Sequence, residues 1–585
     1  MNEIKKEPPI SEVPEQLAEP THSLDELKPE KPPVKHRSVA RSAGIVSIAV
    51  MFSRVLGLIR ETIFAKYFGA GFLYDAFLVG FRIPNILRDL FAEGALSAAF
   101  VKVFTDYQLK KNEVEAWRLA SLIFNALAVV LSIITILGIL FAPYIVPLLA
   151  WGFPPEKAAL AVTLTQIMFP FILLVALAAV AMGVLNTKGR FGVPASASTA
   201  FNIFAIIFGL GLAFYLSGGV WEASSDKNAV PGAAAQWAII GMAIGTLIGG
   251  AAQLAIQIPS LLRVGFSFSP VLSFTDEGVR RVMRLMGPAI IGTSAVQVKV
   301  LVDTFIVSGI EGGNSWLSYA FRLMQFPIGL FGVAIGTAAI PTLSRLASEN
   351  NFDQFRSTLS GAIKLVFLLA IPSACGLIVL GEPIVRLLYE RGEFTAFDTD
   401  MTAWGLAAYS LGLAGYAAIK VLSPSFYALD DAKTPMYVSL ASIAVHVVTS
   451  FGMMKLLSTV GVTAERPDGF GHVGVALATS TVALVNFLAL VFLMRRRING
   501  MNGGQILTSL IKIVIASAAM SAICYLSYLF LTAYFAEKDF VIRLIEAFLP
   551  IGLGGITFII AAKLLRIEEL EKVYKALAAK IGGAK

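Results

Sequence analysis

The sequence predicts an all-α polytopic membrane protein with fourteen transmembrane helices: two parallel-repeat six-helix lobes plus two extra C-terminal helices. Three observations predict it. Of the 585 residues, 56% are hydrophobic and only 15% are charged, whereas soluble proteins carry about 25% charged residues. Apolar runs long enough to cross a bilayer recur along the chain. The first half of the chain also matches the second half at a constant offset, which indicates an internal repeat.

The chain opens with a segment of different composition. Residues 1–36 are rich in Pro, Glu and Lys and poor in aromatic residues. Such a composition cannot bury a core, so we expect a disordered cytoplasmic tail. The segment has no apolar stretch of the kind found in signal peptides.

Charges in the loops orient the predicted spans. With the N-terminus inside, six internal loops carry fourteen Lys and Arg, counting Arg284 at the edge of a span, and seven external loops carry five, counting Lys157 at the edge of a span. Membrane proteins gather Lys and Arg on the cytoplasmic side, so both termini are expected in the cytoplasm. The same bias accounts for the net charge of +8 without a nucleic-acid partner. The predicted spans are 40–66, 73–105, 117–150, 157–187, 195–216, 232–258, 284–308, 315–343, 360–389, 400–428, 435–457, 471–494, 506–533 and 541–565.

The internal repeat defines the predicted domains. "FRIPNILRDLFAEGALSAA" at 81–99 and "FRLMQFPIGLFGVAIGTAA" at 321–339 match at six of nineteen positions, at an offset of 240 residues. The offset covers six spans, an even number, so the two halves share one orientation. Two parallel-repeat lobes are typical of transporters, which handle substrate between the lobes. The predicted domains are a tail (1–36), an N-lobe (37–262), a C-lobe (263–498), helices 13 and 14 (499–566) and an amphipathic cytoplasmic tail (567–585).

Charged residues inside the predicted spans are the candidate functional residues, because each is costly at bilayer depth unless it faces water or a partner. Asp75, Arg82 and Asp89 recur every seven residues and share one helical stripe, which predicts a self-neutralising column with a structural or gating role. Lys299 and Asp303 lie four residues apart, so we expect them to pair, with ion coupling as the alternative role.

Four arginines remain without an obvious acidic neighbour on their own helix: Arg54, Arg60, Arg88 and Arg322. Each alone is compatible with snorkelling to the interface or with an interlobe ion pair. Together they predict a cationic cavity. The planar guanidinium stays charged and donates two parallel hydrogen bonds to phosphate, so the expected ligand is an anion such as a diphosphate.

Motifs of covalent chemistry are missing from the sequence. It contains no P-loop, HExxH or GxSxG motif, and its four histidines are scattered, so we expect no enzyme activity, no cofactor and no metal site. An intramembrane enzyme acting on prenyl diphosphates would need paired acidic residues for Mg²⁺. Asp430 and Asp431 offer such a pair, but "LDDAKTP" is more typical of a turn. A scaffold without transport activity is disfavoured by the intact arginine set.

Several long motifs resemble one known family. "SRVLGLIRETIFAKYFGAG", "YDAFLVGFRIPNILRDLFAEGALSAAFV", "YAFRLMQFPIGLFGVAIGTAAIPTLS", "RGEFTAFDTDMTAWGL" and "FYALDDAKTP" are similar to the MurJ (MviN) family of bacterial lipid II flippases. The resemblance covers about residues 40–500. Its superfamily also contains multidrug exporters and polysaccharide flippases.

The resemblance implies translocation of lipid II, the undecaprenyl-diphosphate-linked peptidoglycan precursor, across the bacterial inner membrane by alternating access. It places the family's functional arginines on Arg54, Arg60, Arg88 and Arg322 and its helix-2 acidic residues on Asp75 and Glu93. It assigns helices 13 and 14 to a groove for the lipid tail.

The partners implied are lipid II, membrane lipids and other cell-wall synthesis proteins. Alternative functions are a related polyprenyl-diphosphate-oligosaccharide flippase or a multidrug exporter of the same superfamily. A multidrug cavity should favour acidic and aromatic residues, whereas this one is rich in arginine.

Overall fold

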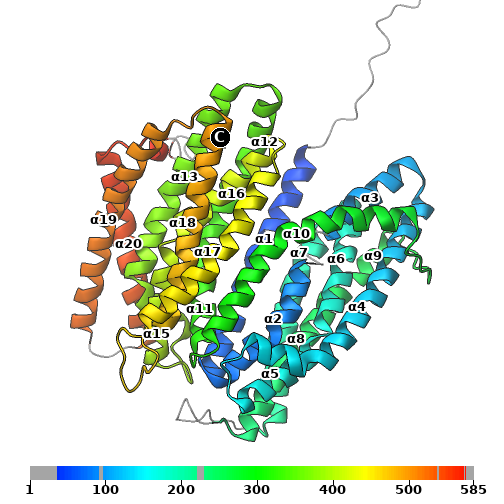
Figure 1. Cartoon of the computed structure of the whole chain (residues 1–585), viewed down its shortest axis with the longest axis horizontal. Coiled ribbons are helices and arrows are strands. Elements are labelled where there is room, and N and C mark those ends of the chain that lie inside the picture. Colours follow the sequence, from blue (N-terminus) through cyan, green and yellow to red (C-terminus); the bar gives the residue numbers. More distant parts are fainter. Residues whose placement is uncertain (1–35, 91–95, 220–229, 536–538, 572–573, 575–585) are drawn as a thin grey trace, which may run out of the picture.

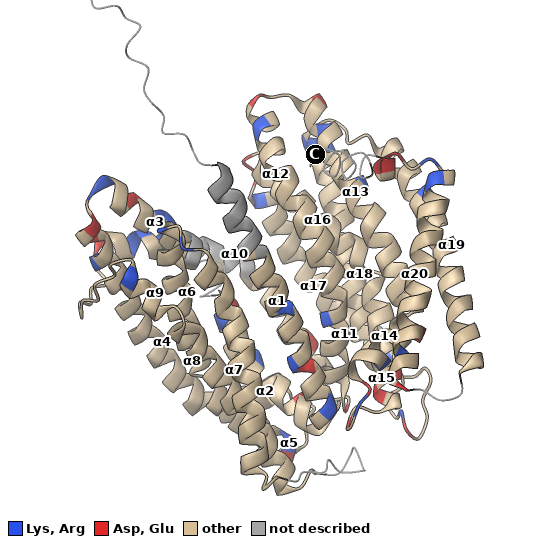
Figure 2. Cartoon of the chain, turned by 180° about the vertical axis from the view of Figure 1, so that it is seen from behind, with Lys and Arg blue, Asp and Glu red and all other residues tan. Residues whose placement is uncertain are grey.

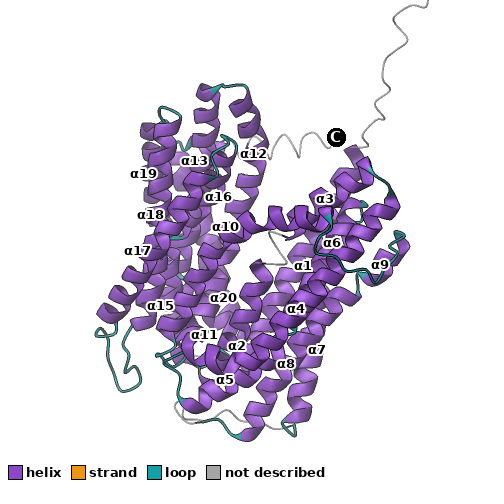
Figure 3. Ribbon diagram, turned by 45° about the vertical axis from the view of Figure 1, so that its right-hand side comes forward, coloured by secondary structure: helices purple, strands orange, loops and turns teal. Residues whose placement is uncertain are grey.

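A computed structural model describes residues 36–90, 96–219, 230–535, 539–571 and 574. Within these ranges every regular element is helical, and long helices lie side by side in two bundles inclined to each other (Figure 3). The first helix starts, and the last one ends, at the same end of the molecule (Figure 1). The predicted tail at 1–36 lies outside the described residues except for His36.

A first bundle is formed by α1 to α9. Its most extensive packing is between α7 and α8, and α2 packs against α5 and α1 against α7. Helix α4 begins at a capping residue, because the side chain of Asn112 accepts a hydrogen bond from the Glu115 backbone N–H at 2.8 Å. The bounds are α1 His36–Phe68, α2 Phe72–Arg88, α3 Ser97–Lys110, α4 Glu113–Leu149, α5 Pro155–Met168, α6 Phe171–Thr187, α7 Gly192–Leu216, α8 Ala233–Ala255 and α9 Ile258–Arg263.

Helix α10 (Glu277–Val307) links the first bundle to a second one. It packs against α3 and α4 on one side and against α17 on the other. The second bundle consists of α11 Gly313–Pro327, the π-helical turn η2 Ile328–Gly332, α12 Val333–Ser348, α13 Phe352–Val379, α14 Gly381–Tyr389, α15 Ala396–Ser410, α16 Leu413–Tyr427, α17 Lys433–Leu457 and α18 Gly471–Arg497.

Two final helices flank the second bundle. Helices α19 (Gly503–Tyr534) and α20 (Phe540–Leu564) pack against each other, and they contact α13 and α14 respectively. The first residues of the predicted C-terminal tail pack against α13 and α19 through Glu569. Glu569, only 4% exposed, pairs with Lys364 of α13 at 2.7 Å and accepts a hydrogen bond from Ser509 of α19 at 2.8 Å.

Ten described helices are long and apolar enough to cross a membrane, or eleven when α15 and α16, bent by 43°, count as one span. These correspond to eleven of the predicted spans. The other three, 40–66, 73–105 and 284–308, carry most of the candidate site charges. The chain is therefore a polytopic membrane protein, and the count of fourteen stays a prediction.

Glycines allow α7 and α8 to approach closely. A Cβ atom placed on Gly245 of α8 would lie 2.2 Å from the Cα atom of Gly209 on α7, nearer than real atoms approach. The contact joins backbone to backbone, so no side-chain rotation can relieve it. Small residues serve this purpose in membrane helix pairs.

Replacing Gly245 by Ala is therefore expected to separate α7 from α8 and to destabilise the protein by about 1–3 kcal/mol. The measurement is the melting temperature of the purified protein in detergent. Gly211→Ala on the same helix pair is the matched control, because a Cβ atom there meets nothing within 4 Å. Equal melting temperatures for the two variants would contradict the close approach.

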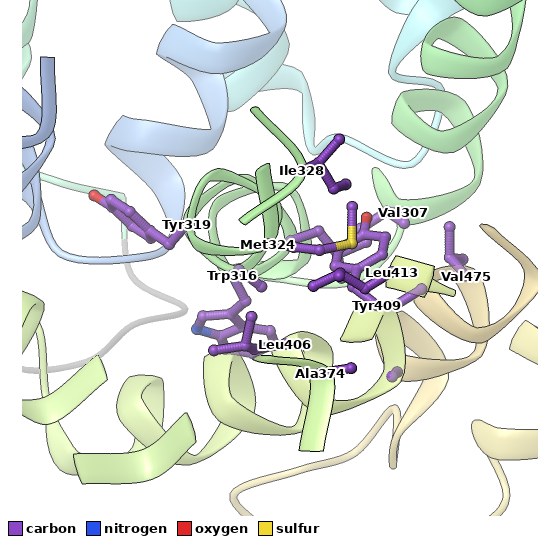
Figure 4. Close-up of a cluster of buried hydrophobic side chains, with 14 of the residues drawn as sticks. Val307, Trp316, Tyr319, Met324, Ile328, Ala374, Leu406, Tyr409, Leu413 and Val475 are labelled. Atoms are coloured by element: carbon purple, nitrogen blue, oxygen red, sulfur yellow. The ribbon is translucent and has the colours of Figure 1, made fainter. Parts of the chain in front are cut away.

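Aromatic and aliphatic side chains join the two bundles at one end. Tyr74 of α2 stacks on Tyr319 of α11 with ring centroids 5.0 Å apart, and Tyr319 is fully buried. Farther inside the second bundle, Trp316 and Met324 of α11 pack with Leu406 of α15 (Figure 4). This core fixes α11 against its neighbours and thereby positions the site charges carried by α2 and α11.

Candidate anion-binding site

Helix α1 carries two of the predicted arginines, Arg54 and Arg60. Arg54 is exposed. A Cβ atom placed on Gly329 of η2 would lie 2.7 Å from the Nη1 atom of Arg54. The Arg54 guanidinium thus reaches from the first bundle to the π-helical turn of the second.

Arg322 lies on α11 of the second bundle and forms an ion pair with Glu61 of α1. Its Nη2 atom is 2.5 Å from the Glu61 Oε1 atom. The carboxylate is almost completely buried, with 6% of its side chain exposed, whereas 53% of the Arg322 side chain is exposed. The guanidinium therefore has accessible donors left for a further anion after pairing with Glu61.

Arg60 stands beside these two groups. Its guanidinium carbon lies 5.2 Å from the ring centroid of Phe201 on α7, an arrangement that suits a cation over an aromatic face. Arg60 also lies within Coulombic range of the like charges of Arg322 and Arg88. Cations that repel one another at short range favour binding of an anion between them.

Arg88, at the end of α2, pairs with the adjacent Asp89. The Arg88 Nη2 atom is 2.6 Å from the Asp89 Oδ1 atom, and the two side chains are 24% and 27% exposed. Asp89 also accepts a hydrogen bond of 3.2 Å from Gln297 of α10. The pair thus lies where α2 meets α10.

Among the four predicted arginines, Arg60 of α1 lies within Coulombic range of Arg88 on α2 and Arg322 on α11, whereas Arg54 of α1 contacts the second bundle at Gly329. Figure 2 shows charged residues mainly at the two ends of the molecule, with a few along α1 and α11 between them. Guanidinium groups are suited to binding an anion with several phosphate oxygens, and here they come from both bundles.

Asp75 of α2 occupies a different place, at the start of α11. It is fully buried and accepts hydrogen bonds from the backbone N–H of Gly312 (3.0 Å) and of Ser315 (2.8 Å) and from the Ser315 hydroxyl (2.6 Å). A carboxylate at a helix N-terminus satisfies backbone donors that the helix leaves unpaired. Asp75 thus caps a helix of the opposite bundle.

Lys157 of α5 completes this network. It is fully buried, and its Nζ atom lies 2.9 Å from Asp75 and 2.8 Å from Glu311. Further hydrogen bonds between the bundles lie nearby: Gly152 donates to the Ser308 hydroxyl, and Tyr319 donates to the Gly69 carbonyl. We call this region, around Asp75, Lys157, Glu311 and Ser315, the closed end.

The predicted column of Asp75, Arg82 and Asp89 is wrong as a self-neutralising unit. Each residue faces a different partner: Asp75 pairs with Lys157, Asp89 pairs with Arg88, and Arg82 lies in the Coulombic field of Asp303. Residues seven apart on one helix are separated by about 10 Å along its axis, so partners on neighbouring helices are closer.

The predicted pair of Lys299 and Asp303 is also wrong. Lys299 donates to the hydroxyl of Tyr416 at 2.7 Å, whereas Asp303 lies 2.6 Å from the Nε2 atom of His446. Both partners come from second-bundle helices that pack near α10, and such tertiary contacts cannot be read from spacing along one helix.

Glu93, which was predicted as a site residue, lies outside the described residues. Sequence reasoning missed three charged residues near the predicted ones: Glu61, Lys157 and Glu311. Glu61 follows Arg60 directly in the first predicted span, so its position inside the span was a usable signal. Glu311 lies in a predicted external loop and Lys157 at the external end of the predicted span 157–187, so nothing in the sequence indicated that both are part of the closed end. Among the described residues, no group of three His, Cys, Asp or Glu side chains is placed to hold a metal ion.

The fold defines the class of protein. A solved structure described as an inward-facing multidrug resistance MATE family transporter of the MOP superfamily matches with a TM-score of 0.62. The match covers 78% of this chain and 98% of that chain at 14% sequence identity, so it is informative about fold alone. The chain shares the fold of that protein.

The family follows from closer matches. The model of the family described as "Lipid II flippase MurJ" matches residues 64–546, so the chain belongs to the MurJ family. The "Lipid II flippase MurJ" of Burkholderia cenocepacia is 35% identical over 459 residues, covering 77% of this chain and 83% of that protein. The "Probable lipid II flippase MurJ" of Vibrio cholerae is 34% identical over 464 residues, covering 78% and 82%.

A solved structure of the same family also matches. It is described as "Lipid II flippase MurJ, inward closed conformation", and it aligns with a TM-score of 0.69 at 29% identity. The alignment covers 89% of this chain and 98% of that chain.

Proposed function

We propose that this protein translocates lipid II from the inner to the outer leaflet of the bacterial cytoplasmic membrane. The observation that carries the proposal is the set of arginines where the two bundles meet: Arg60 lies near Arg88 and Arg322, and Arg54 contacts Gly329 of the second bundle. Its family relatives are described as lipid II flippases. A diphosphate carries several acceptor oxygens, and guanidinium groups bind such oxygens in pairs.

In this proposal the chain crosses the membrane fourteen times, with both termini in the cytoplasm and the closed end outside. The closed end then seals the external side while the arginines face the cytoplasm. The diphosphate enters between the bundles, the seal at Asp75 opens, and the bundles close at the cytoplasmic side. Helices α19 and α20 hold the polyprenyl chain, since their outer faces expose many large apolar side chains.

The mechanism requires binding that changes with conformation. Arg54 and Arg60 belong to the first bundle and Arg322 to the second, so a movement of one bundle against the other changes the spacing of the guanidinium groups. A ligand shifts such an equilibrium only by its differential affinity for the two states. The diphosphate thus favours the state in which its oxygens meet the most donors.

The test is leaflet-resolved labelling of lipid II in cells depleted of this protein. Depletion is expected to trap lipid II in the inner leaflet, and expression of the wild-type chain is expected to return it to the outer leaflet. Arg345→Ala serves as a control for handling of the variants, because Arg345 lies on α12 with 68% of its side chain exposed. Normal outer-leaflet labelling in depleted cells would contradict the proposed function.

A further inference from the structure

Two turns related by the internal repeat flank Asp75 and Ser315 at the closed end. The turn after α4 contains Gly152 and the turn after α14 contains Gly392, which are 240 residues apart, like Asp75 and Ser315 themselves. Each turn contacts the end of the helix that begins the other repeat, α10 for Gly152 and α1 for Gly392. The closed end is therefore a contact between equivalent parts of the two repeats.

Both turns bring backbone against backbone. A Cβ atom placed on Gly152 would lie 2.4 Å from the Cα atom of Gly309. One placed on Gly392 would lie 2.2 Å from the carbonyl oxygen of Lys66 on α1. The backbone N–H of Glu393 donates to the same Lys66 carbonyl at 2.9 Å. Separation of the bundles at this end must remove these contacts.

The turn after α14 differs from its repeat counterpart because it carries charges. The positions equivalent to Arg386 and Glu390 are Val146 and Ala150, at the same offset of 240 residues. Val146 and Ala150 are buried in the apolar core. Helices α19 and α20 lie beyond the two repeats, so a group on them is available to the second turn alone.

The charges of the second turn pair with α19 and α20. The Arg543 Nη1 atom of α20 donates to the Glu390 carbonyl at 2.8 Å, and its Nη2 atom lies 3.2 Å from the Glu390 carboxylate. That carboxylate also accepts a hydrogen bond of 2.8 Å from Thr399 and lies 3.5 Å from Arg386. Arg386 in turn donates to the Tyr528 hydroxyl of α19 at 3.2 Å. The side chains of Arg543 and Glu390 are only 23% and 15% exposed, so solvent screens their ion pair weakly.

One short turn thus contacts both α1 and α20. Glu390, which Arg543 holds, lies two residues before Gly392, which lies against Lys66. Helix α14, which leads into the turn, also packs against both α1 and α20. A displacement of the turn relative to α1 therefore reaches α20 through a pair of hydrogen bonds from one guanidinium group.

We propose that the turn at residues 390–394 transmits opening of the closed end to α20. The inference rests on the proposed function, in which the closed end is external and α19 and α20 hold the polyprenyl chain. When the bundles separate, the turn leaves Lys66 and moves the attached end of α20 through Arg543. By reciprocity, a polyprenyl chain that binds the displaced α20 more tightly favours opening of the closed end.

Removal of the attachment has a predictable direction. Displacement of α20 disturbs its packing against α19 and α14, so the attachment adds to the free energy needed for opening. Without it, the closed end opens while α20 stays in place. Arg543→Gln is therefore expected to raise the ratio of open to closed molecules by about tenfold, a usual size for coupling between sites.

The experiment opens the closed end from the turn of the first bundle and follows α20. Gly152→Ala is the opening variant, because the added Cβ atom meets the backbone of Gly309. The full-length protein is studied in detergent, with Cys375 and Cys524 replaced by Ala. Two pairs of spin labels at exposed positions report the closed end and the distance from α17 to α20 respectively: Glu156→Cys with Ala396→Cys, and Leu456→Cys with Val541→Cys.

In Gly152→Ala we expect both label distances to change. When Arg543→Gln is added, the closed end should stay open while the distance from α17 to α20 returns to that of the unsubstituted protein. Lys563→Gln is the matched control, because it removes an exposed positive charge from the other end of α20 and should change neither distance. If Gly152→Ala does not fold or leaves the closed end shut, Asp75→Asn takes its place as the opening variant.

An unchanged distance from α17 to α20 while the closed end opens would overturn the inference. The same conclusion follows if that distance still responds to opening in the presence of Arg543→Gln, or if Arg543→Gln alone leaves the ratio of open to closed molecules unchanged. Should Arg543→Gln not fold, Glu390→Gln replaces it, because it removes the ionic part of the attachment. These distances are measured without lipid II. Normal outer-leaflet labelling of lipid II in depleted cells therefore refutes the proposed function alone.

Discussion

Replacing Arg322 by Ala is expected to lower the rate of lipid II translocation by about a hundredfold. A charge-assisted bidentate hydrogen bond contributes about 1.5–3 kcal/mol, and each 1.4 kcal/mol is tenfold in binding. Arg322 is the second-bundle member of the arginine set, and half of its side chain remains accessible beside Glu61. The measurement is the rate at which outer-leaflet lipid II appears in cells that contain only the variant.

Substitution of Glu61 distinguishes a loss of substrate binding in Arg322→Ala from a loss of stability. Arg322→Ala leaves the Glu61 carboxylate buried and unpaired, which is itself destabilising. The double variant Arg322→Ala, Glu61→Gln removes that penalty. If Arg322 binds the diphosphate, the double variant stays inactive while its melting temperature recovers. Recovery of translocation in the double variant would mean that Arg322 only neutralises Glu61, and the assignment to substrate would be withdrawn.

The all-helical membrane architecture was predictable because membrane spans leave a strong signal. The length of an apolar run is set by the thickness of the bilayer, so runs such as 117–150 and 471–494 reappear as single helices. Breaks inside spans were harder to predict. Pro170 separates α5 from α6 and Gly412 lies between α15 and α16, yet Pro143 and Pro147 lie inside the continuous helix α4. Neighbouring helices decide which prolines interrupt a helix.

The site was predictable in part for a related reason. A charge inside an apolar run is conspicuous, and Arg54, Arg60, Arg88 and Arg322 were found in this way. Their partners were not, because pairing depends on how helices distant in sequence pack. Glu61 lies 261 residues from Arg322 along the chain. Lys157 and Asp75 likewise meet only once α5 packs against α2.

Replacing Asp75 by Asn is expected to open the closed end and to lower the translocation rate by at least a hundredfold. Asp75 accepts hydrogen bonds from Gly312 and Ser315 on both carboxylate oxygens and also pairs with Lys157. An amide has one acceptor oxygen, so the variant cannot satisfy these donors, and Lys157 keeps only Glu311. Breaking a buried ion pair on one side costs about 3–5 kcal/mol. The distance between spin labels attached at Glu156→Cys on α5 and Ala396→Cys on α15, both exposed positions, is expected to increase.

The energetic origin of this effect is measured by a double-mutant cycle with Lys157→Met. Removing both buried charges leaves neither Asp75 nor Lys157 as an unpaired charge, but Glu311 loses its ion pair with Lys157. The double variant is therefore expected to regain only about 1 kcal/mol of stability relative to Asp75→Asn alone. Its closed end should nevertheless stay weakened, because the cap on α11 is lost in both. Glu156→Gln, next to Lys157 on α5 but exposed, is the control and should change neither quantity. Additive losses in the cycle would show that Asp75 and Lys157 act independently, and the closed end would then depend on the helix cap alone.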